Sequence, residues 1–402
     1  MCPICKSEQK EIILNFNCGR FDGSKLYRTV RIASCSSCGH IFNDLKDREI
    51  EDLDKYYNNE YAPINFEIIN KPGGVNVYNN LSEQNYCDLF KIVQPCLKIN
   101  SNILDIGCKT GGFLSYLGNQ GFRNIFGSDT IQPYVDYAKK NIAYSVEYGS
   151  PYKLPYENDF FDFINMNQVL EHISDPIGVF TEINRVLKDG GFLSIGLPDA
   201  ERYNNFYFFD LYWFLLREHI QHFDSRHLFM LASQNGFKLT KYVQADYNMM
   251  SGTMVMPNFY AVFKLNKNYK NYKNDSKNIE KFLLKKNITS YINNEKKNLT
   301  SKKDNLKYSI MSKSSIYIWG IGREFFYMYE NLGLKQCNNL NLIDSNVFKQ
   351  NNFHVDGMEI KSPSVLESAP LDSVIIISAI AHKESIKRHI GLSKYKGEIF
   401  EF

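Results

Sequence analysis

The stretch ILDIGCKTGGFL, from Ile103 to Leu114, decides the fold of this chain. An apolar run leads to Asp105 and then breaks at a glycine-rich turn. This order predicts a buried β-strand, a tight turn and the start of a helix. Glycine has no side chain to keep a ligand away from the backbone, so the turn suits a nucleotide-like ligand. Alone the pattern is a weak signal, because many nucleotide sites share it.

The next predicted strand narrows the class of ligand. Residues 124–128 form a short apolar run that ends in Asp129. An acidic residue at the carboxyl end of the second strand can accept hydrogen bonds from both hydroxyls of a ribose. The two strands together therefore indicate a nucleoside bound across the ends of a parallel sheet.

Three further motifs follow in order: LPYENDFFDFI at 154–164, NMNQVLEHI at 165–173 and INRVLKDGGFLSI at 183–195. With the first two motifs, this series closely resembles the class I S-adenosylmethionine-dependent methyltransferases. The LDIGCGTG, GxD, LPFxDxSFD, VLEHIxDP and LKPGG motifs of that family have counterparts here in the same order along the chain. The resemblance implies an α/β, Rossmann-like core that binds S-adenosyl-L-methionine. The residues implied at the cofactor are Asp105, Gly107, Cys108, Gly111, Asp129, Ser150 and Asn167.

Two positions depart from that family's pattern. Lys109 stands where the commonest loop has a third glycine, and a non-glycine residue with positive φ costs about 1 kcal/mol. The turn is therefore expected to be slightly reshaped. Ser150 stands near the place of the acid that usually precedes the LPF element, which implies adenine contacts through Ser150 or the backbone. His172, in the LEHI motif, is expected to pack near the adenosyl group or to cap a turn.

The size and composition of the chain argue against several classes of protein. A chain of 402 residues predicts two or three domains. The formal net charge of +3 is nearly neutral and predicts no nucleic-acid partner. There is no run of 18 uncharged apolar residues, and the first residues resemble no signal peptide. We therefore expect no membrane span and a cytoplasmic protein, whose oligomeric state the sequence leaves open.

Cysteines are concentrated near the start of the chain. Cys2 and Cys5 form one Cys-x2-Cys pair, and Cys35 and Cys38 form a second. Two such pairs can bind one tetrahedral Zn²⁺, and four thiolates predict a structural rather than a catalytic metal. The alternative, a pair of disulfides, is disfavoured in a reducing cytosol. Cys18 is a spare that could replace one ligand.

Four segments are predicted along the chain. Residues 1–45 form a zinc-ribbon-like module with a β-hairpin, and residues 46–265 the methyltransferase domain. Residues 266–313 are rich in lysine and asparagine, with apolar residues at helical spacing, and predict a long exposed helical linker. Residues 314–402 contain a second strand–turn–helix, with Gly320, Gly322 and a later Asp344, and predict a small Rossmann-like domain. Whether this domain binds a ligand stays open.

This layout resembles the sugar C-methyltransferases that act on nucleotide-linked ketosugars. The resemblance implies a nucleotide-sugar or surface-glycan precursor as acceptor, with O- or C-methylation unresolved. Glu218 and His219 match that family's acid–base Glu-His pair, while His222 stands where the family has tyrosine. These three residues are the catalytic candidates, with a loop-shaping role as the alternative. Other functions left open are a small-molecule or lipid-precursor O-methyltransferase and a non-catalytic zinc-module interaction protein.

Overall fold

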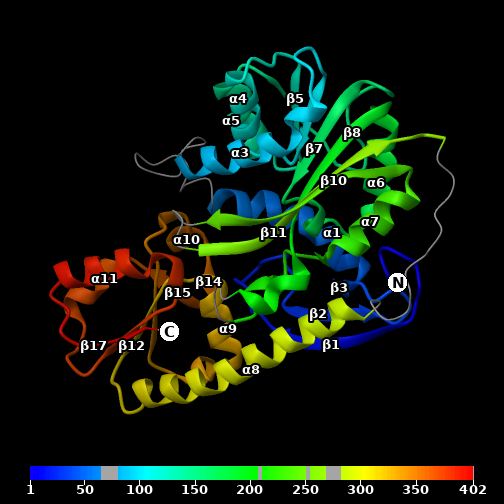
Figure 1. Cartoon of the computed structure of the whole chain (residues 1–402). Coiled ribbons are helices and arrows are strands. Elements are labelled where there is room, and N and C mark those ends of the chain that lie inside the picture. Colours follow the sequence, from blue (N-terminus) through cyan, green and yellow to red (C-terminus); the bar gives the residue numbers. More distant parts are fainter. Residues whose placement is uncertain (65–79, 207–210, 250–253, 269–281, 402) are drawn as a thin grey trace.

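Three β-sheets organise the chain (Figure 1). The computed structural model describes residues 1–64, 80–206, 211–249, 254–268 and 282–401. Within these ranges the sheets have four, seven and six strands, and the largest has the order β10-β11-β8-β7-β4-β5-β6. The α/β, Rossmann-like fold expected from the glycine-rich turn is therefore present at the centre of the molecule.

The central sheet is parallel except at one strand. Its members are β4 (Ile103–Ile106), β5 (Ile125–Asp129), β6 (Ser145–Tyr148), β7 (Phe161–Asn167), β8 (Leu187–Pro198), β10 (Phe237–Met249) and β11 (Met254–Leu265). Only β11 runs against its neighbours, since it pairs antiparallel with both β8 and β10. The parallel pairing of β4 with β5 and with β7 sets their carboxyl ends side by side at one edge. The first two predicted strands are confirmed to within one residue.

Helices cover both faces of this sheet. On one face lie α3 (Asn80–Val93), α4 (Gly112–Asn119) and α5 (Gln132–Asn141); on the other lie α6 (Pro176–Val186) and α7 (Ser225–Gln234). The first face is packed by Leu89, Phe113 and Val135. The second is packed by Phe180 and Leu228. Burial of strand residues on both faces explains the almost continuous apolar runs in the sequence.

The N-terminal sheet includes a strand from the central part of the chain. Its strands are β1 (Lys10–Asn17), β2 (Thr29–Cys35), β3 (Ile41–Asn43) and β9 (Gln221–His222). Residue Ile41 pairs with His222 and Phe42 with Gln221. The predicted hairpin is present, although its second strand begins at Thr29 rather than at residue 25. The four-stranded sheet thus extends beyond the expected module 1–45.

The C-terminal sheet has the expected Rossmann-like arrangement. Its order is β14 (His354–Val355), β15 (Met358–Lys361), β13 (Leu340–Ile343), β12 (Ile316–Trp319), β16 (Val374–Ile377) and β17 (Glu398–Glu401). All of its pairings are parallel except that of β14 with β15. The helices α9 (Arg323–Asn331), α10 (Val347–Asn352) and α11 (Lys383–Leu392) connect the strands.

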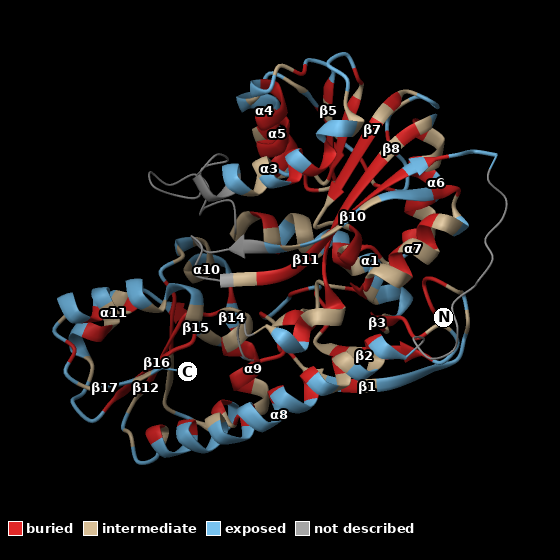
Figure 2. Ribbon diagram, in the orientation of Figure 1, coloured by how far each residue is buried: buried red, intermediate tan, exposed pale blue. Residues whose placement is uncertain are grey.

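Helix α8 (Leu283–Ile310) corrects the expectation of an exposed linker helix (Figure 2). It lies along the bottom of the molecule, and its buried residues include Leu284, Ile288, Ile292 and Leu299. These side chains join one hydrophobic core with the N-terminal module and the C-terminal domain. Most lysines of the helix, such as Lys286, Lys296 and Lys303, are exposed to solvent. The helix was predicted correctly, but its apolar stripe is a packing surface; residues 269–281 lie outside the described part of the chain.

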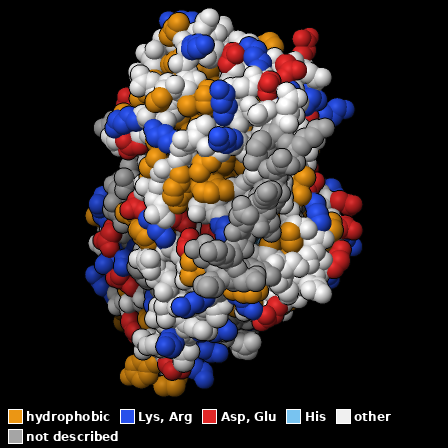
Figure 3. Space-filling model, turned by 45° about the vertical axis from the view of Figure 1, so that its right-hand side comes forward, with side chains coloured by type: hydrophobic (Ala, Val, Ile, Leu, Met, Phe, Trp, Pro, Cys, Tyr) orange, Lys and Arg blue, Asp and Glu red, His pale blue; other side chains and the backbone are white. Residues whose placement is uncertain are grey.

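The surface in one view carries charged side chains of both signs. On the face drawn in Figure 3, lysine and arginine side chains are interspersed with aspartate and glutamate. Among the helices that the structure describes, none combines the length and apolar character needed to cross a bilayer.

Candidate functional site

The glycine-rich turn after β4 has the backbone that its sequence predicts. Gly107 has φ +74°, Gly111 has φ +85°, and Lys109 is itself left-handed with φ +51°. Lys109 therefore takes a left-handed backbone conformation that favours glycine, at a cost of about 1 kcal/mol. The Asp129 carboxylate accepts hydrogen bonds from the backbone N–H groups of Lys109 and Ile131, each at 2.9 Å. The predicted ribose acid thus lies directly at the turn.

The other predicted cofactor residues surround this turn. The side chain of Asp105 is buried and accepts a hydrogen bond from Asn165 Nδ2 at 2.7 Å, and burial raises its pKa to about 7. Cys108 is buried, and burial raises the pKa of its thiol. Ser150 accepts a hydrogen bond from the N–H of Tyr152 at 3.3 Å. Asn167 ends β7, and its side-chain oxygen is buried without a hydrogen-bond partner.

Replacing Gly107 by alanine is expected to lower the free energy of unfolding by about 1–3 kcal/mol. An added Cβ would lie 2.4 Å from Val169 Cγ2, in addition to the strain of positive φ. Gly23 offers a matched control, because its φ is +75° but nothing lies within 4 Å of an added Cβ. Urea unfolding should show a larger loss for Gly107→Ala than for Gly23→Ala. Equal losses would mean that the contact with Val169 is relieved without cost.

A pocket of about 1100 Å³ opens beside the turn. One wall comes from the central domain and includes Lys109, Gln168 and Glu171. The opposite wall comes from the C-terminal domain, whose glycine turn at Gly320 and α10 residue Lys349 face the same space. The carboxyl ends of the parallel strands in the central sheet and in the C-terminal sheet therefore border the same pocket. The sequence predicted each edge separately but gave no sign that they meet.

The described lining residues are contributed by several elements. Those from the N-terminal half are Phe21, Ser24, Tyr56, Tyr57, Glu60, Tyr61, Ile64, Lys109, Gln168, Glu171 and His172. Those from the second half that concern the chemistry are Trp213, Arg217, Glu218, His219, Arg323, Asp344, Asn346, Lys349 and His382. The aromatic wall around Tyr56 and Tyr57 comes from α1 (Asp47–Tyr56) and a π-helical turn (Tyr57–Tyr61).

Two of the three catalytic candidates lie in this pocket. Glu218 accepts a hydrogen bond from the Tyr56 hydroxyl at 2.9 Å, which fixes its carboxylate. The rings of His219 and His172 are perpendicular, with centroids 5.0 Å apart. Burial and the neighbouring His172 hold the pKa of His219 well below its usual value. The His219 imidazole is therefore held in its neutral form, in which an unprotonated ring nitrogen can accept a hydrogen bond or bind a cation.

His172 lies with His219 at the pocket. It belongs to the 3-10 turn Leu170–His172, and its Nδ1 is 2.8 Å from the carbonyl oxygen of Glu218. Burial lowers its pKa to about 4. The adjacent Glu171 has both carboxylate oxygens buried without a hydrogen-bond partner, and burial raises its pKa to about 8. The LEHI motif thus supplies two side chains to the pocket beside His219, a position that was not predicted for it from the sequence.

The structure separates His222 from the other two candidates. His222 is fully buried on β9, where it pairs with Ile41, and it does not line the pocket. Neither ring nitrogen has a hydrogen-bond partner, and burial lowers its pKa to about 3. Its position at the junction between two sheets gives it no access to an acceptor in this pocket. The EHxxHF segment therefore divides into a pocket-facing half and a packing half.

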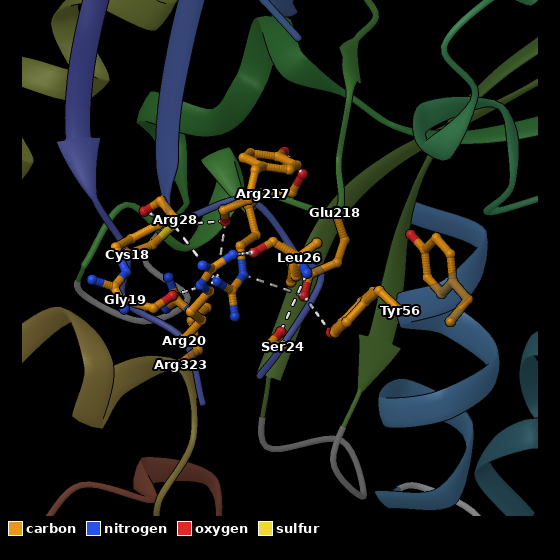
Figure 4. A network of polar contacts seen from close by, with 12 residues as sticks. Cys18, Gly19, Arg20, Ser24, Leu26, Arg28, Tyr56, Arg217, Glu218 and Arg323 are labelled. Atoms are coloured by element: carbon orange, nitrogen blue, oxygen red, sulfur yellow. Dashed lines mark hydrogen bonds and ion pairs between the residues drawn. The ribbon is translucent and has the colours of Figure 1, made fainter. Parts of the chain in front are cut away.

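A buried arginine positions the pocket-facing half (Figure 4). Arg217 donates a hydrogen bond to the Gly19 carbonyl oxygen at 2.6 Å, and its Nε lies 3.9 Å from Glu218 Oε1. The Cys18 thiol lies near the same guanidinium and donates to the Arg28 carbonyl oxygen at 3.0 Å. Cys18 is thus part of the network that joins the N-terminal module to the segment carrying Glu218.

Four other cysteines form a separate cluster. Sγ of Cys2 is 3.7 Å from Sγ of Cys38, and Sγ of Cys5 is 3.6 Å from Sγ of Cys35. All four sulfur atoms lie within 4.8 Å of one another. Sulfurs bound at 2.3 Å to a tetrahedral Zn²⁺ are separated by about 3.8 Å, so the arrangement fits that ion. A disulfide would require about 2.05 Å, and Cys18 is outside the cluster.

Comparison with known proteins agrees with the central fold. Residues 81–242 match the family described as a methyltransferase domain. An uncharacterised methyltransferase of Schizosaccharomyces pombe is 32% identical over 113 residues, which cover 24% of this chain and 40% of that protein. An uncharacterised 37.1 kDa protein from a transposon of Streptomyces fradiae is 34% identical over 102 residues, covering 24% of this chain and 30% of that protein.

A solved S-adenosylmethionine-dependent methyltransferase from Methanosarcina mazei is 19% identical, with a TM-score of 0.37, and covers 44% of this chain and 97% of that one. The chain spans two fifths or less of the curated relatives that it matches. The central part of the chain is a class I S-adenosylmethionine-dependent methyltransferase domain, an enzyme domain. The family matched by residues 81–242 extends over neither the cysteine cluster nor the C-terminal sheet.

Proposed function

We propose that this protein transfers the methyl group of S-adenosyl-L-methionine to a sugar, either nucleotide-linked or part of a surface-glycan precursor. The observation that carries the proposal is the shared pocket, in which the cofactor turn of one Rossmann-like sheet faces the glycine turn of another. Such crevices at the carboxyl ends of parallel strands are the usual ligand sites of α/β folds. Acceptor and cofactor would meet between them.

Different predicted residues would bind different parts of S-adenosyl-L-methionine. Asp129 would hold the ribose hydroxyls, the turn from Gly107 to Gly111 the methionine part, and Ser150 the adenine. When bound, the cofactor supplies a sulfonium methyl group that is already activated for transfer. The protein must therefore hold an acceptor in line with the S–CH₃ bond and exclude water.

The acceptor end would lie at the cluster of Glu171, His172 and His219. Transfer forms an O–CH₃ or C–CH₃ bond and breaks the S–CH₃ bond, whose electron pair stays on sulfur; the acceptor loses one proton. His219 and Glu218 both line the pocket, and the Tyr56 hydroxyl fixes the Glu218 carboxylate. We therefore assign deprotonation of the acceptor to this cluster. A positioned group of this kind contributes about 10²–10⁴-fold to the rate.

The proposed division of labour includes the flanking segments. Residues 1–45 would be held by one structural Zn²⁺ on Cys2, Cys5, Cys35 and Cys38, which favours a reducing, cytoplasmic setting. Residues 314–402 would dock the non-reacting part of the acceptor, with residues 266–313 joining them to the methyltransferase domain, residues 46–265. At the C-terminal glycine turn, Asp344 already accepts hydrogen bonds from Ile321 N and Lys349 Nζ, each at 2.9 Å.

A labelled-methyl assay tests the proposal, with the full chain, a panel of acceptors that contains nucleotide sugars, small phenols, acids and lipid precursors, and mass spectrometry to locate the methyl group. Label on a sugar carbon or oxygen is the expected result. Label only on small phenols, acids or lipid precursors would favour the alternative O-methyltransferase. A chain that binds no S-adenosyl-L-methionine would instead favour the non-catalytic interaction protein.

A further inference from the structure

One carboxylate and two imidazoles converge at the acceptor end of the pocket. Each of Glu171, His172 and His219 offers a ligand atom, and these atoms lie within 4.8 Å of one another. His172 Nε2 and Glu171 Oε1 are 4.0 Å apart. This separation is too long for a hydrogen bond. The three groups therefore face a common point without bonding to each other.

The hydrogen bonds behind the cluster leave the facing atoms available. His172 Nδ1 is 2.8 Å from the carbonyl oxygen of Glu218, which can only accept, so the proton of the neutral ring is on Nδ1. The lone pair is then on Nε2, toward Glu171. Histidines that bind metals commonly donate their other ring N–H to a backbone carbonyl in this way. His219 Nδ1 is buried and has no hydrogen-bond partner.

The surroundings of Glu171 are an independent indication of a ligand that binds at this cluster. The Glu171 side chain is only 2% exposed, and neither carboxylate oxygen has a hydrogen-bond partner in another residue. A buried carboxyl group without partners is costly, and buried charges are usually paired or bound to metal. The side chain lines the pocket, so a cation entering from solvent can reach it.

We infer that Glu171, His172 and His219 bind a divalent first-row transition-metal ion. Two imidazoles and one carboxylate on one side of an ion, with the remaining positions open, form a recognised site for such metals. Metal–ligand bonds of about 2.1 Å would draw the three atoms from their separations of up to 4.8 Å to about 3 Å from one another. The open positions would face the pocket. Any effect of the ion on the acceptor rests on the proposed function, whereas ion binding does not.

The test is titration of Mn²⁺ alone into the full chain, after loosely bound ions are removed on a chelating resin. Free Mn²⁺ gives a sharp six-line electron paramagnetic resonance signal that broadens on binding. We expect one saturable site per chain. Glu171→Gln and His219→Ala should each weaken Mn²⁺ binding by at least about tenfold. The conservative glutamine variant keeps the shape of the buried side chain, and circular dichroism establishes that each variant is folded.

His382→Ala is the matched control. His382 is an exposed histidine that lines the same pocket from the C-terminal side, outside the cluster. Its removal should leave the affinity for Mn²⁺ unchanged. The inference is overturned if the wild-type chain shows no saturable Mn²⁺ site, or if folded Glu171→Gln and His219→Ala bind Mn²⁺ as the wild type does. Because neither cofactor nor acceptor is present, absence of methyl transfer would count against the proposed function and not against the ion site.

Discussion

Serine at both Cys2 and Cys35 is expected to abolish the binding of about one zinc ion per chain and to unfold strands β1 to β3. The expected effect is large, because a structural zinc site contributes apparent binding free energies of about 10–16 kcal/mol. Each substitution removes one thiolate from a different Cys-x2-Cys pair, and the sulfurs of Cys2 and Cys35 are both buried. Metal analysis after reducing purification, followed by limited proteolysis of the N-terminal segment, measures both outcomes.

Cys18→Ser is the control for this prediction. Its thiol lies against Arg28 and Arg217 rather than in the cluster, so its replacement should leave the zinc content unchanged. A wild-type chain with almost no zinc would show that the four cysteines do not hold this metal. If Cys18→Ser lost zinc while the double variant kept it, the assignment of the zinc ligands would be wrong.

His219→Ala is expected to lower turnover by about 10²-fold or more while leaving the affinity for S-adenosyl-L-methionine unchanged. The ring lines the pocket at the proposed acceptor end, whereas the predicted cofactor residue Asp129 lies at the turn after β4. Single-turnover measurements with the true acceptor, together with calorimetric titration of the cofactor, separate the two effects. Glutamine at the same position keeps a polar group but lacks the imidazole nitrogens, so it should not restore the rate.

Unchanged turnover in His219→Ala would leave the Glu218-His219 pair with a loop-shaping role only. A parallel loss of cofactor affinity would instead indicate that the substitution disturbs the neighbouring LEHI turn, through its ring contact with His172. The two results therefore test the acceptor role independently of cofactor binding.

Local patterns made the strand and turn of the candidate cofactor site predictable. The strand before Gly107 and the place of Asp129 beside the turn follow from short stretches of sequence, because a parallel strand and its turn carry their own signals. The left-handed backbone of Lys109 was not predicted, because this residue was expected to reshape the turn. The helix over residues 283–310 was also predictable from its apolar spacing. Its buried face was not, because the lysine-rich composition hides which partner covers the apolar stripe.

The acceptor half depends on contacts between distant segments. Strand β9 has only two residues, Gln221 and His222, and its pairing with β3 has no periodic signature. That pairing is what places His222 in the interior and turns His219 toward His172. The approach of the C-terminal glycine turn to the same pocket is likewise a consequence of packing around α8. Side chains 47 positions apart, such as His172 and His219, could not be brought together from spacing alone.

Calorimetric titration of S-adenosyl-L-methionine into the full chain tests the central claim most directly. The wild-type chain should bind one molecule, and Asp129→Ala should bind it at least about tenfold more weakly, since charge-assisted hydrogen bonds contribute about 1.5–3 kcal/mol. Asp136→Ala, which removes an exposed acid from the following helix α5, should leave the affinity unchanged. Absence of binding to the wild type, or equal affinity in Asp129→Ala, would contradict the account.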